Sequence, residues 1–440
     1  MTRSPDSSSA TRGPSLSSRI AKGGRWRGRF GSILGSLLLL PGFSQGDWAQ
    51  FLGPERSGVA ADKAVPHTWP TEGPRKLWSR PVGNGFSGPV VQGTRAFLFH
   101  RLQDEETVEC FDASKGTTLW KSGTPTAYVD DFGFDPGPRS TPALAGDRIV
   151  TLGAAGRAEC RETQAGKLIW SVDTQKQFGA RKGFFGLAPS PLIDRQQVIL
   201  HVGGENGASI LALDFATGNL RWKSGDDEAS YASPILVSFQ GKRRLLVLTR
   251  EALTSLDPDT GKPFFRFPWR PSTHASVSAA TPLWVDGRIA LSASYETGAT
   301  FLKYEDAGPT KIWESDEAIS SHYSSLVHHQ GFLYGFDGRQ EQGCDLRCVE
   351  VETGKVRWTQ KRTGAGHLIL VGSDLLLLTE KGELVLAPAS PEGFKPWARA
   401  QVLPFLARAH PAFSDGRFYA RSKDTLFCFD LRSPGPAESR

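Results

Sequence analysis

Residues able to bind a polar ligand recur at one place in this 440-residue sequence, just before a repeated Pro-led segment that is typical of a short β-strand. Arginine and histidine supply positive charge or hydrogen bonds, and tyrosine adds a hydroxyl to a flat ring. The residues three positions or one position before the Pro, or its equivalent, are Phe86, Arg139, Tyr231, His322, His367, Arg408 and His410. If these strands surround one axis, the six other than Phe86 form a site for an anion, a quinone or a peptide carboxylate. The alternative is a polar, water-filled channel with no dedicated ligand.

Two long connecting segments, residues 122–139 and 171–187, combine charged and aromatic side chains. The first carries Asp130, Asp131 and Asp135 with Tyr128, Phe132 and Phe134, and the second carries Lys176, Arg181 and Lys182 with Phe184 and Phe185. Two interpretations stay open. The segments pack on each other through phenylalanine and opposite charge, or they form a lid or recognition surface over the channel.

Motifs for haem and nucleotide phosphate chemistry are absent, because the sequence has no CxxCH or GxxxxGK. Four of the five cysteines, Cys110, Cys160, Cys348 and Cys428, share one repeat position, where other repeats have Ala212 and Ser255. This predicts buried free thiols that pack as small apolar groups. A local disulfide between Cys344 and Cys348 is the alternative, and we predict no metal site.

The elements that position these residues are repeats of one motif: a small residue, an acid two positions later, a turn with glycine, and an aromatic four residues after the glycine. It reads CFDASKGTTLW at 110–120, CRETQAGKLIW at 160–170, ALDFATGNLRW at 212–222, SLDPDTGKPFF at 255–265 and CVEVETGKVRW at 348–358. The motif aromatics, degenerate copies included, are Trp78, Trp120, Trp170, Trp222, Phe265, Trp313, Trp358 and Trp397, spaced by 39 to 52 residues. Such a period is the signature of a repeat fold.

Each repeat offers four short strands, so eight repeats predict an all-β fold, an eight-bladed β-propeller with four-stranded antiparallel blades. The glycine allows a tight turn, the acid accepts hydrogen bonds from the turn, and the aromatic ring covers the neighbouring blade. RKLWSRP at 75–81 has the Trp without the turn, whereas LFCFDL at 426–431 has the acid without the Trp. These complementary halves predict a ring closed by an N-terminal strand that joins the C-terminal blade.

The N-terminus differs from the rest in charge and hydropathy. Residues 1–46 hold seven Lys or Arg and one acid, which account for the whole net charge of +6, so the remainder gives no electrostatic reason to bind nucleic acid. A basic stretch, an apolar run at 30–43 and Ser44-Gln45-Gly46 predict a signal peptide. An uncleaved anchor is the alternative, and the absence of cysteine before Cys110 argues against a lipoprotein. We predict a leader at 1–46, an extension at 47–74, the propeller at 75–431 and a disordered tail at 432–440.

The repeat motif resembles the tryptophan-docking motif of PQQ-type β-propellers, which include quinoprotein alcohol dehydrogenases and BamB-like assembly factors. GDWAQFLGPERSGVA at 46–60 and HTWPTEGPRKLW at 67–78 are similar to the start of exported bacterial PQQ-binding-like β-propeller repeat proteins. The quinoprotein resemblance implies PQQ, a calcium set, a catalytic Asp, a Trp floor and often adjacent cysteines. This sequence lacks a Cys-Cys pair, and Glu205, Asn206, Tyr295 and Glu296 complete no calcium set.

We therefore expect a non-catalytic binding scaffold, exported to the periplasm or the cell exterior and monomeric, with no transmembrane span in the mature chain. Its expected partner is an envelope protein or a small anionic ligand. The alternative is a PQQ- and calcium-dependent dehydrogenase that oxidises an alcohol or a sugar.

Overall fold

A computed structural model describes residues 46–62, 64–70, 72–274 and 276–432, which belong to one compact unit formed by residues 40–440. The predicted leader, apart from Gly46, and residues 433–440 of the predicted tail lie outside the described residues. Arg432, the first residue of that tail, forms an ion pair with Asp430 at 2.7 Å.

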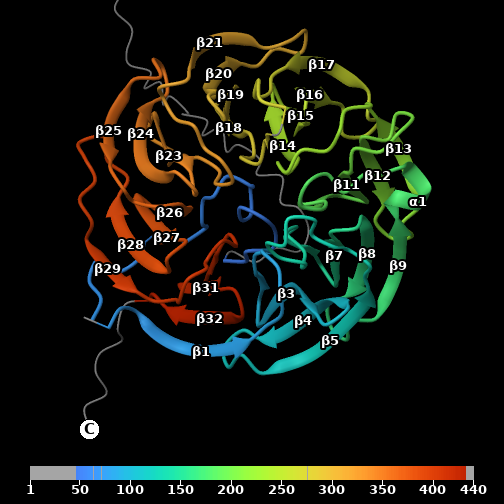
Figure 1. Cartoon of the computed structure of the whole chain (residues 1–440), viewed down its shortest axis with the longest axis horizontal. Coiled ribbons are helices and arrows are strands. Elements are labelled where there is room, and N and C mark those ends of the chain that lie inside the picture. Colours follow the sequence, from blue (N-terminus) through green and yellow to red (C-terminus); the bar gives the residue numbers. More distant parts are fainter. Residues whose placement is uncertain (1–45, 63, 71, 275, 433–440) are drawn as a thin grey trace, which may run out of the picture. The chain divides into compact units, whose positions relative to one another are not determined.

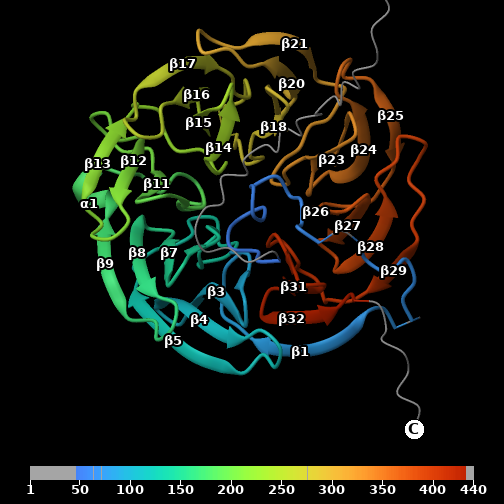
Figure 2. The same cartoon turned by 180° about the vertical axis from the view of Figure 1, so that it is seen from behind.

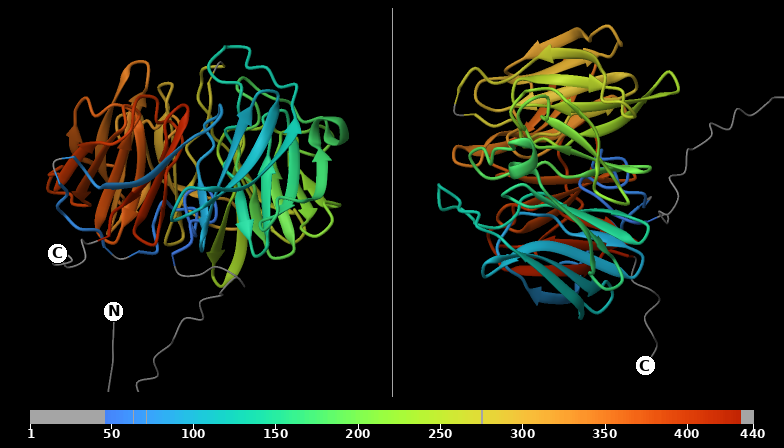
Figure 3. Two further views of the ribbon diagram at one scale, coloured as in Figure 1. Left: turned by 90° about the horizontal axis from the view of Figure 1, so that it is seen from below. Right: turned by 90° about the vertical axis from the view of Figure 1, so that its right-hand side faces the viewer.

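Eight four-stranded sheets follow one another around a ring, and all neighbouring strands within them are antiparallel (Figure 1). This confirms the predicted eight-bladed β-propeller. In the edge-on view the strands slant along the direction of the ring axis (Figure 3). The one helix among the described residues is α1 (Thr174–Phe178), inside the second long connecting segment.

Blades 1 to 4 each use four consecutive strands. Blade 1 has β2 (Val90–Gln92), β3 (Arg95–Leu102), β4 (Glu105–Asp112) and β5 (Thr118–Pro125). Blade 2 has β6 (Ala143–Ala145), β7 (Arg148–Leu152), β8 (Arg157–Glu162) and β9 (Leu168–Asp173). Blade 3 has β10 (Leu192–Asp194), β11 (Gln197–His201), β12 (Ile210–Asp214) and β13 (Leu220–Ser224). Blade 4 has β14 (Ile235–Phe239), β15 (Lys242–Leu248), β16 (Ala252–Leu256) and β17 (Pro263–Pro268).

Blades 5 to 7 continue this pattern, and blade 8 combines both ends of the described chain. Blade 5 has β18 (Leu283–Val285), β19 (Arg288–Ala293), β20 (Gly298–Lys303) and β21 (Thr310–Ser315). Blade 6 has β22 (Val327–His329), β23 (Phe332–Arg339), β24 (Gly343–Glu350) and β25 (Val356–Gln360). Blade 7 has β26 (Gly366–Val371), β27 (Asp374–Thr379), β28 (Glu383–Pro388) and β29 (Ala398–Gln401). Blade 8 has β30 (Ala412–Ser414), β31 (Arg417–Arg421), β32 (Thr425–Asp430) and β1 (Arg75–Pro81).

Blade 8 closes the ring as predicted, because β1 pairs antiparallel with β32 and places Trp78 opposite Cys428. The middle strands of a blade lie between two neighbouring sheets, and their sequences reflect burial on both faces. β27, with the sequence DLLLLT, is buried along its whole length. The hydrophobic core is therefore distributed around the ring between successive blades.

The predicted docking aromatics join one blade to the next. Trp78, Trp120, Trp170, Trp222, Trp313 and Trp358 each donate an indole N–H to a backbone carbonyl of the following blade, at 2.7–3.1 Å. Trp78, Trp170, Trp222 and Phe265 are buried, whereas Trp120, Trp313 and Trp358 are half-buried. The rings of five of these tryptophans lie directly on the motif glycine of the next blade. A Cβ added to Gly116, Gly166, Gly218, Gly261 or Gly354 would come within 2.8 Å of that ring.

Phe265 and Trp397 do not follow this scheme. Phe265 packs against Tyr304 of blade 5, at a ring separation of 5.5 Å. Trp397 is 48% exposed, bonds to Asp374 within its own blade and stacks on His67 at 4.7 Å. For Trp397 the reason is the closure of the ring: the third and fourth strands of blade 8 come from opposite ends of the chain, so no glycine turn joins them.

The cysteines behave as predicted, since all five are buried and free. Cys110, Cys160, Cys348 and Cys428 each lie directly opposite a docking tryptophan on the neighbouring strand of the same blade. A small residue leaves room for the large indole in these blades, whereas Phe301 lies at the equivalent place opposite Trp313 in blade 5. No disulfide joins Cys344 to Cys348.

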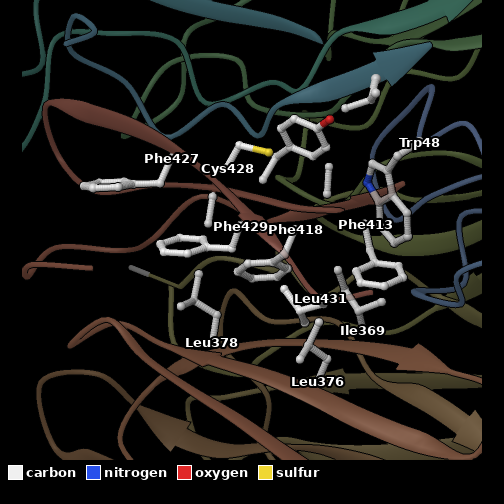
Figure 4. Close-up of a cluster of buried hydrophobic side chains, with 14 of the residues drawn as sticks. Trp48, Ile369, Leu376, Leu378, Phe413, Phe418, Phe427, Cys428, Phe429 and Leu431 are labelled. Atoms are coloured by element: carbon white, nitrogen blue, oxygen red, sulfur yellow. The ribbon is translucent and has the colours of Figure 1, made fainter. Parts of the chain in front are cut away.

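The segment from Asp47 to Asp62, part of the predicted extension, occupies the centre of the ring in both axial views (Figures 1 and 2). Trp48 pairs with Val91 of blade 1 through two backbone hydrogen bonds of 2.9 Å, and Val59 forms a parallel bridge with Leu370 of blade 7. Figure 4 shows Trp48 beside Phe413, in the core cluster of blades 7, 8 and 1. We call residues 47–62 the plug.

Arg56 anchors the plug across the channel. Its guanidinium donates hydrogen bonds to the carbonyls of Ser190, Pro191 and Pro234, which belong to blades 3 and 4. Burial lowers the pKa of Arg56 to about 9.

Among the described residues, no helix is long and apolar enough to cross a membrane.

Candidate functional site

A chain of hydrogen bonds runs around the channel at the start of the inner strands. Each backbone N–H of one blade donates to the hydroxyl at the same position of the next blade, at 2.9–3.1 Å. The residues in order are Gly88, Thr141, Ser190, Ser233, Thr281 and Ser325. His367 and His410 hold the same position in blades 7 and 8, where their rings lie 5.0 Å apart. The chain fixes the inner strands at one depth and so aligns the residues beside it.

A cavity of about 490 Å³ lies at this level. All six predicted site residues line it: Arg139, Tyr231, His322, His367, Arg408 and His410. Phe51 of the plug lies among the lining residues together with Thr141, Ser190 and Ser233 of the hydroxyl chain. The structure thus brings together residues from six blades, while their role in binding stays a prediction.

Aromatic side chains dominate the wall, which contains six phenylalanines and three tyrosines. Phe132 and Phe134 from residues 122–139 contact Phe184 and Phe185 from residues 171–187, with ring separations of 5.2–6.2 Å. Lys182 of the second segment pairs with Asp131 of the first at 2.6 Å. The two segments therefore pack on each other, as the first interpretation predicted, and their shared aromatic cluster lines the cavity. Their role as a lid or recognition surface stays a prediction.

The arginines of the cavity are all paired with carboxylates. Arg139 Nη2 lies 3.2 Å from Asp130 Oδ2, Arg408 bonds to Glu380, and Arg339 Nε lies 3.4 Å from Glu341 Oε2. Burial acts to raise the pKa of Asp130, but backbone N–H donors and Arg139 outweigh it and hold that pKa below its usual range. An anion, one of the ligands considered from the sequence, would therefore meet arginines that already have carboxylate partners.

The histidines of the cavity carry no charge at neutral pH. Burial lowers the pKa of His367 to about 4 and that of His410 to about 3, and it also lowers the pKa of His322. His367 Nε2 donates to the carbonyl of Arg408 at 2.8 Å, and His410 packs against Trp48 of the plug. These rings contribute shape and hydrogen bonds rather than positive charge.

A second chain of hydrogen bonds crosses the cavity wall on the side of blades 5 and 6. The Tyr295 hydroxyl lies 2.9 Å from His322 Nε2, and His322 Nδ1 lies 2.7 Å from Gln340 Oε1. Gln340 Nε2 lies 2.8 Å from Glu341 Oε1. A second cavity of about 620 Å³ shares Gln340, Glu341 and Arg408 with the first.

Several residues of the cavity wall were not predicted from the sequence. Arg339, Gln340 and Glu341 belong to the end of β23 and its turn into β24, which is not the turn that carries the repeat motif. Phe51 lies outside the repeats altogether. The repeated Ser/Thr-Pro dipeptide was a usable signal for Thr141, Ser190 and Ser233, because the hydroxyl precedes the same proline in each blade.

The donor set does not fit a calcium-bound quinone. Glu341 is the one carboxylate among the residues that line the cavity, and it already accepts from Gln340 and pairs with Arg339. Within the described residues no group of three His, Cys, Asp or Glu is placed to hold a metal ion. Calcium prefers six to eight oxygen ligands, which this wall does not supply.

Comparisons with known proteins agree with the fold. Among solved structures, BamB from Moraxella catarrhalis has a TM-score of 0.60 at 14% identity, covering 82% of this chain and 99% of that chain. The quinohemoprotein alcohol dehydrogenase from Comamonas testosteroni has a TM-score of 0.64 at 13% identity, covering 90% and 82%. A europium-containing methanol dehydrogenase has a TM-score of 0.53 at 11% identity, covering 88% and 98%. At these identities the likeness shows the fold alone.

The family assignment comes from the sequence. No curated protein matches the chain. A family model described as outer membrane protein assembly factor BamB matches residues 104–360. Since this match covers more than half of the 440 residues, the chain belongs to the BamB-like family of PQQ-type propellers.

Proposed function

We propose that this chain is a non-catalytic binding protein of the cell envelope, and that its channel cavity holds a small ligand or a side chain of an envelope protein. The observation that carries the proposal is the cavity itself, a chamber of about 490 Å³ with nine aromatic side chains in its wall and the plug beside it. Such apolar, concave sites with a few polar groups are typical of ligand pockets. The BamB-like family supports a binding role by analogy of fold.

The pairing of charges favours binding over catalysis. Each cavity arginine is matched by a carboxylate, and the histidines are neutral at pH 7, so the wall offers apolar surface and directed hydrogen bonds. General acid–base catalysis works best with a pKa near the operating pH. The pKa values of His367 and His410, at about 4 and 3, are far from that range.

Filling the cavity tests the proposal. Ala188 lines the cavity, so Ala188→Trp places an indole in the space and is expected to abolish function, measured as failure to complement deletion of the gene in its host. Val129→Trp is the matched control, because Val129 is 65% exposed and is not among the lining residues. Full complementation by Ala188→Trp at normal protein level would exclude the cavity as the working site.

The dehydrogenase alternative has its own assay. Protein incubated with PQQ and Ca²⁺ is expected to leave an electron-accepting dye unreduced when alcohols or sugars are added. Dye reduction that depends on PQQ, Ca²⁺ and substrate would replace the binding proposal with an enzymatic one.

Export rests on the leader at residues 1–46, for which we propose cleavage near Gly46–Asp47. N-terminal sequencing of protein from the cell envelope is expected to begin near Asp47. A mature chain that retains Leu37–Leu40 would indicate an anchored form instead.

A further inference from the structure

Tyr295 occupies a backbone conformation that its side chain type does not favour. It lies in the turn between β19 and β20, where Tyr295 and Glu296 both have positive φ, at 64° and 58°. Glycine and asparagine are the usual residues in such turns, because a Cβ is unfavourable there. Backbone strain of this kind is concentrated at functional sites, so the Tyr295 side chain is the place to look for a function.

The hydrogen-bond chain that begins at Glu341 fixes the role of Tyr295. A carboxylate only accepts, so Gln340 presents its Nε2 to Glu341 and its Oε1 to His322. His322 Nδ1 therefore donates to that oxygen, and since burial keeps His322 neutral, its Nε2 has no proton and accepts from the Tyr295 hydroxyl. The Tyr295 hydroxyl thus already donates its hydrogen to His322 Nε2.

The oxygen of Tyr295 is left to accept a hydrogen bond. A phenol oxygen has two lone pairs, and the backbone N–H of Val277 faces this oxygen, which leaves one lone pair for a ligand. Tyr295 lines the cavity, and Arg339 holds its ring in place with the guanidinium carbon 4.5 Å from the ring centroid. A ligand that offers an N–H or O–H at this point gains a bond, whereas a ligand that offers only an acceptor does not.

We propose that Tyr295 determines the specificity of the cavity, which selects an aromatic ligand bearing an N–H or O–H donor. The aromatic wall receives the ring and the Tyr295 oxygen receives the donor hydrogen. This inference rests on the proposed binding function and names the ligand class. The same chemistry is found in a free aromatic compound and in a tryptophan or tyrosine side chain of a partner.

Three probes of similar shape test the donor requirement on the unaltered full chain. Indole has an N–H, 1-methylindole has that hydrogen replaced, and benzothiophene has no donor. Titration calorimetry is expected to show indole binding about three- to tenfold more tightly than the other two, the contribution of one hydrogen bond. Equal affinities, or no binding of any probe, would overturn the inference.

A pair of matched variants assigns the preference to Tyr295. Tyr295→Phe keeps the ring and removes the oxygen, so the preference for indole over 1-methylindole should disappear. Tyr334→Phe is the control, because Tyr334 is buried in the core between blades 6 and 7 and is not among the residues that line the cavity. A preference that survives in Tyr295→Phe would overturn the assignment, whether or not the cavity binds aromatic compounds.

Further measurements distinguish a free aromatic compound from a partner side chain, and the binding function from the donor specificity. N-acetyl-tryptophanamide represents an indole within a polypeptide, so tighter binding than indole indicates a partner side chain, and weaker binding indicates a free compound. Both results support the shared chemistry. The binding function fails if Ala188→Trp complements fully, whereas the specificity inference fails if all three aromatic probes bind equally.

Discussion

His201 is buried at the end of β11, and both of its ring nitrogens are used. Nδ1 lies 3.2 Å from the carbonyl of Ser209, so it carries the proton, and Nε2 accepts from the backbone N–H of Ser230 at 3.1 Å. A second proton on Nε2 would oppose the Ser230 N–H. Burial lowers the pKa of His201 from 6.5 to about 4.

This geometry predicts a loss of stability in acid. The unfolded chain binds a proton at His201 below about pH 6.5, while the folded chain resists it until about pH 4. The contribution of neutral His201 to the free energy of unfolding is therefore complete above pH 6.5. It falls by about 1.4 kcal/mol per pH unit as the pH drops toward 4. Urea denaturation from pH 7 to pH 4.5 measures it. His201→Gln, which supplies a donor and an acceptor but does not titrate, should give a slope shallower by that amount, and parallel curves would contradict the mechanism.

At the residue scale, the sequence predicted positions better than interactions. Arg139 and Arg408 could be assigned to the channel because each precedes an equivalent inner strand. Their partners could not be found, since Asp130 comes from an irregular segment and Glu380 directly follows β27, with no fixed spacing to either arginine. The sequence therefore indicated which residues meet in the cavity, but not that its arginines are paired with carboxylates.

At the element scale, the contact between a docking tryptophan and the next glycine turn joins successive blades. Gly261 has a φ of +72°, and a Cβ there would lie 2.4 Å from Trp222 Cε3. Trp222 also donates its indole N–H to the carbonyl of Pro258 in the same turn, at 3.1 Å. The turn and the ring can approach only if this residue is glycine.

Gly261→Ala should accordingly destabilise the fold by about 2–4 kcal/mol, because left-handed alanine costs about 1–2 kcal/mol and Trp222 must also move from its packed position. Gly241→Ala is a matched control: Gly241 has a φ of +73°, but nothing lies within 4 Å of its Cβ position. Gly241→Ala should lose only the free energy that the left-handed backbone conformation of alanine costs. Free energies of unfolding in denaturant compare the two, and equal losses would show that the contact with Trp222 contributes nothing.

Elements built from repeats were predictable, and those outside the repeats were not. The strands of all eight blades follow from a motif whose small residue, glycine and aromatic have defined packing roles. The plug has no such pattern: Arg56 bonds to carbonyls 134 to 178 residues away, and backbone carbonyls leave no trace in a sequence. Trp397 follows the motif but lies exposed, because its partner turn is interrupted by the chain ends.

At the scale of the whole molecule, the plug ties the two sides of the ring together. It bonds to blade 1 through Trp48, to blade 7 through Gly58 and Ala60, and to blades 3 and 4 through Arg56. The Arg56 guanidinium is fully buried among carbonyl oxygens. Hydrogen bonds made by a charged group are stronger than neutral ones, and their loss leaves buried acceptors unpaired.

Arg56→Met, which keeps the length but not the donors, should cost about 2–4 kcal/mol. It should also accelerate hydrogen exchange at the amides of Trp48 and Ala60, which bond to Val91 and Leu370. Arg75→Met is the control, because Arg75 is 73% exposed and its pair with Asp430 is expected to contribute at most about 1 kcal/mol. Unchanged exchange at Trp48 and Ala60 in Arg56→Met would show that the plug does not depend on Arg56.

The pairing of β1 with β32 has a consequence for the order of folding. Synthesis proceeds from the N-terminus, so β1 is the first strand of the propeller to be made, yet Arg75 must wait for Asp430, 355 residues later. Blades 1 to 7 are each formed from neighbouring strands and can assemble locally, whereas blade 8 requires closure of nearly the entire chain. The entropy of that closure is offset only at the last step, when both ends of the polypeptide enter one sheet. The strand of the propeller that is synthesised first, β1, is therefore the last to pair with its neighbour.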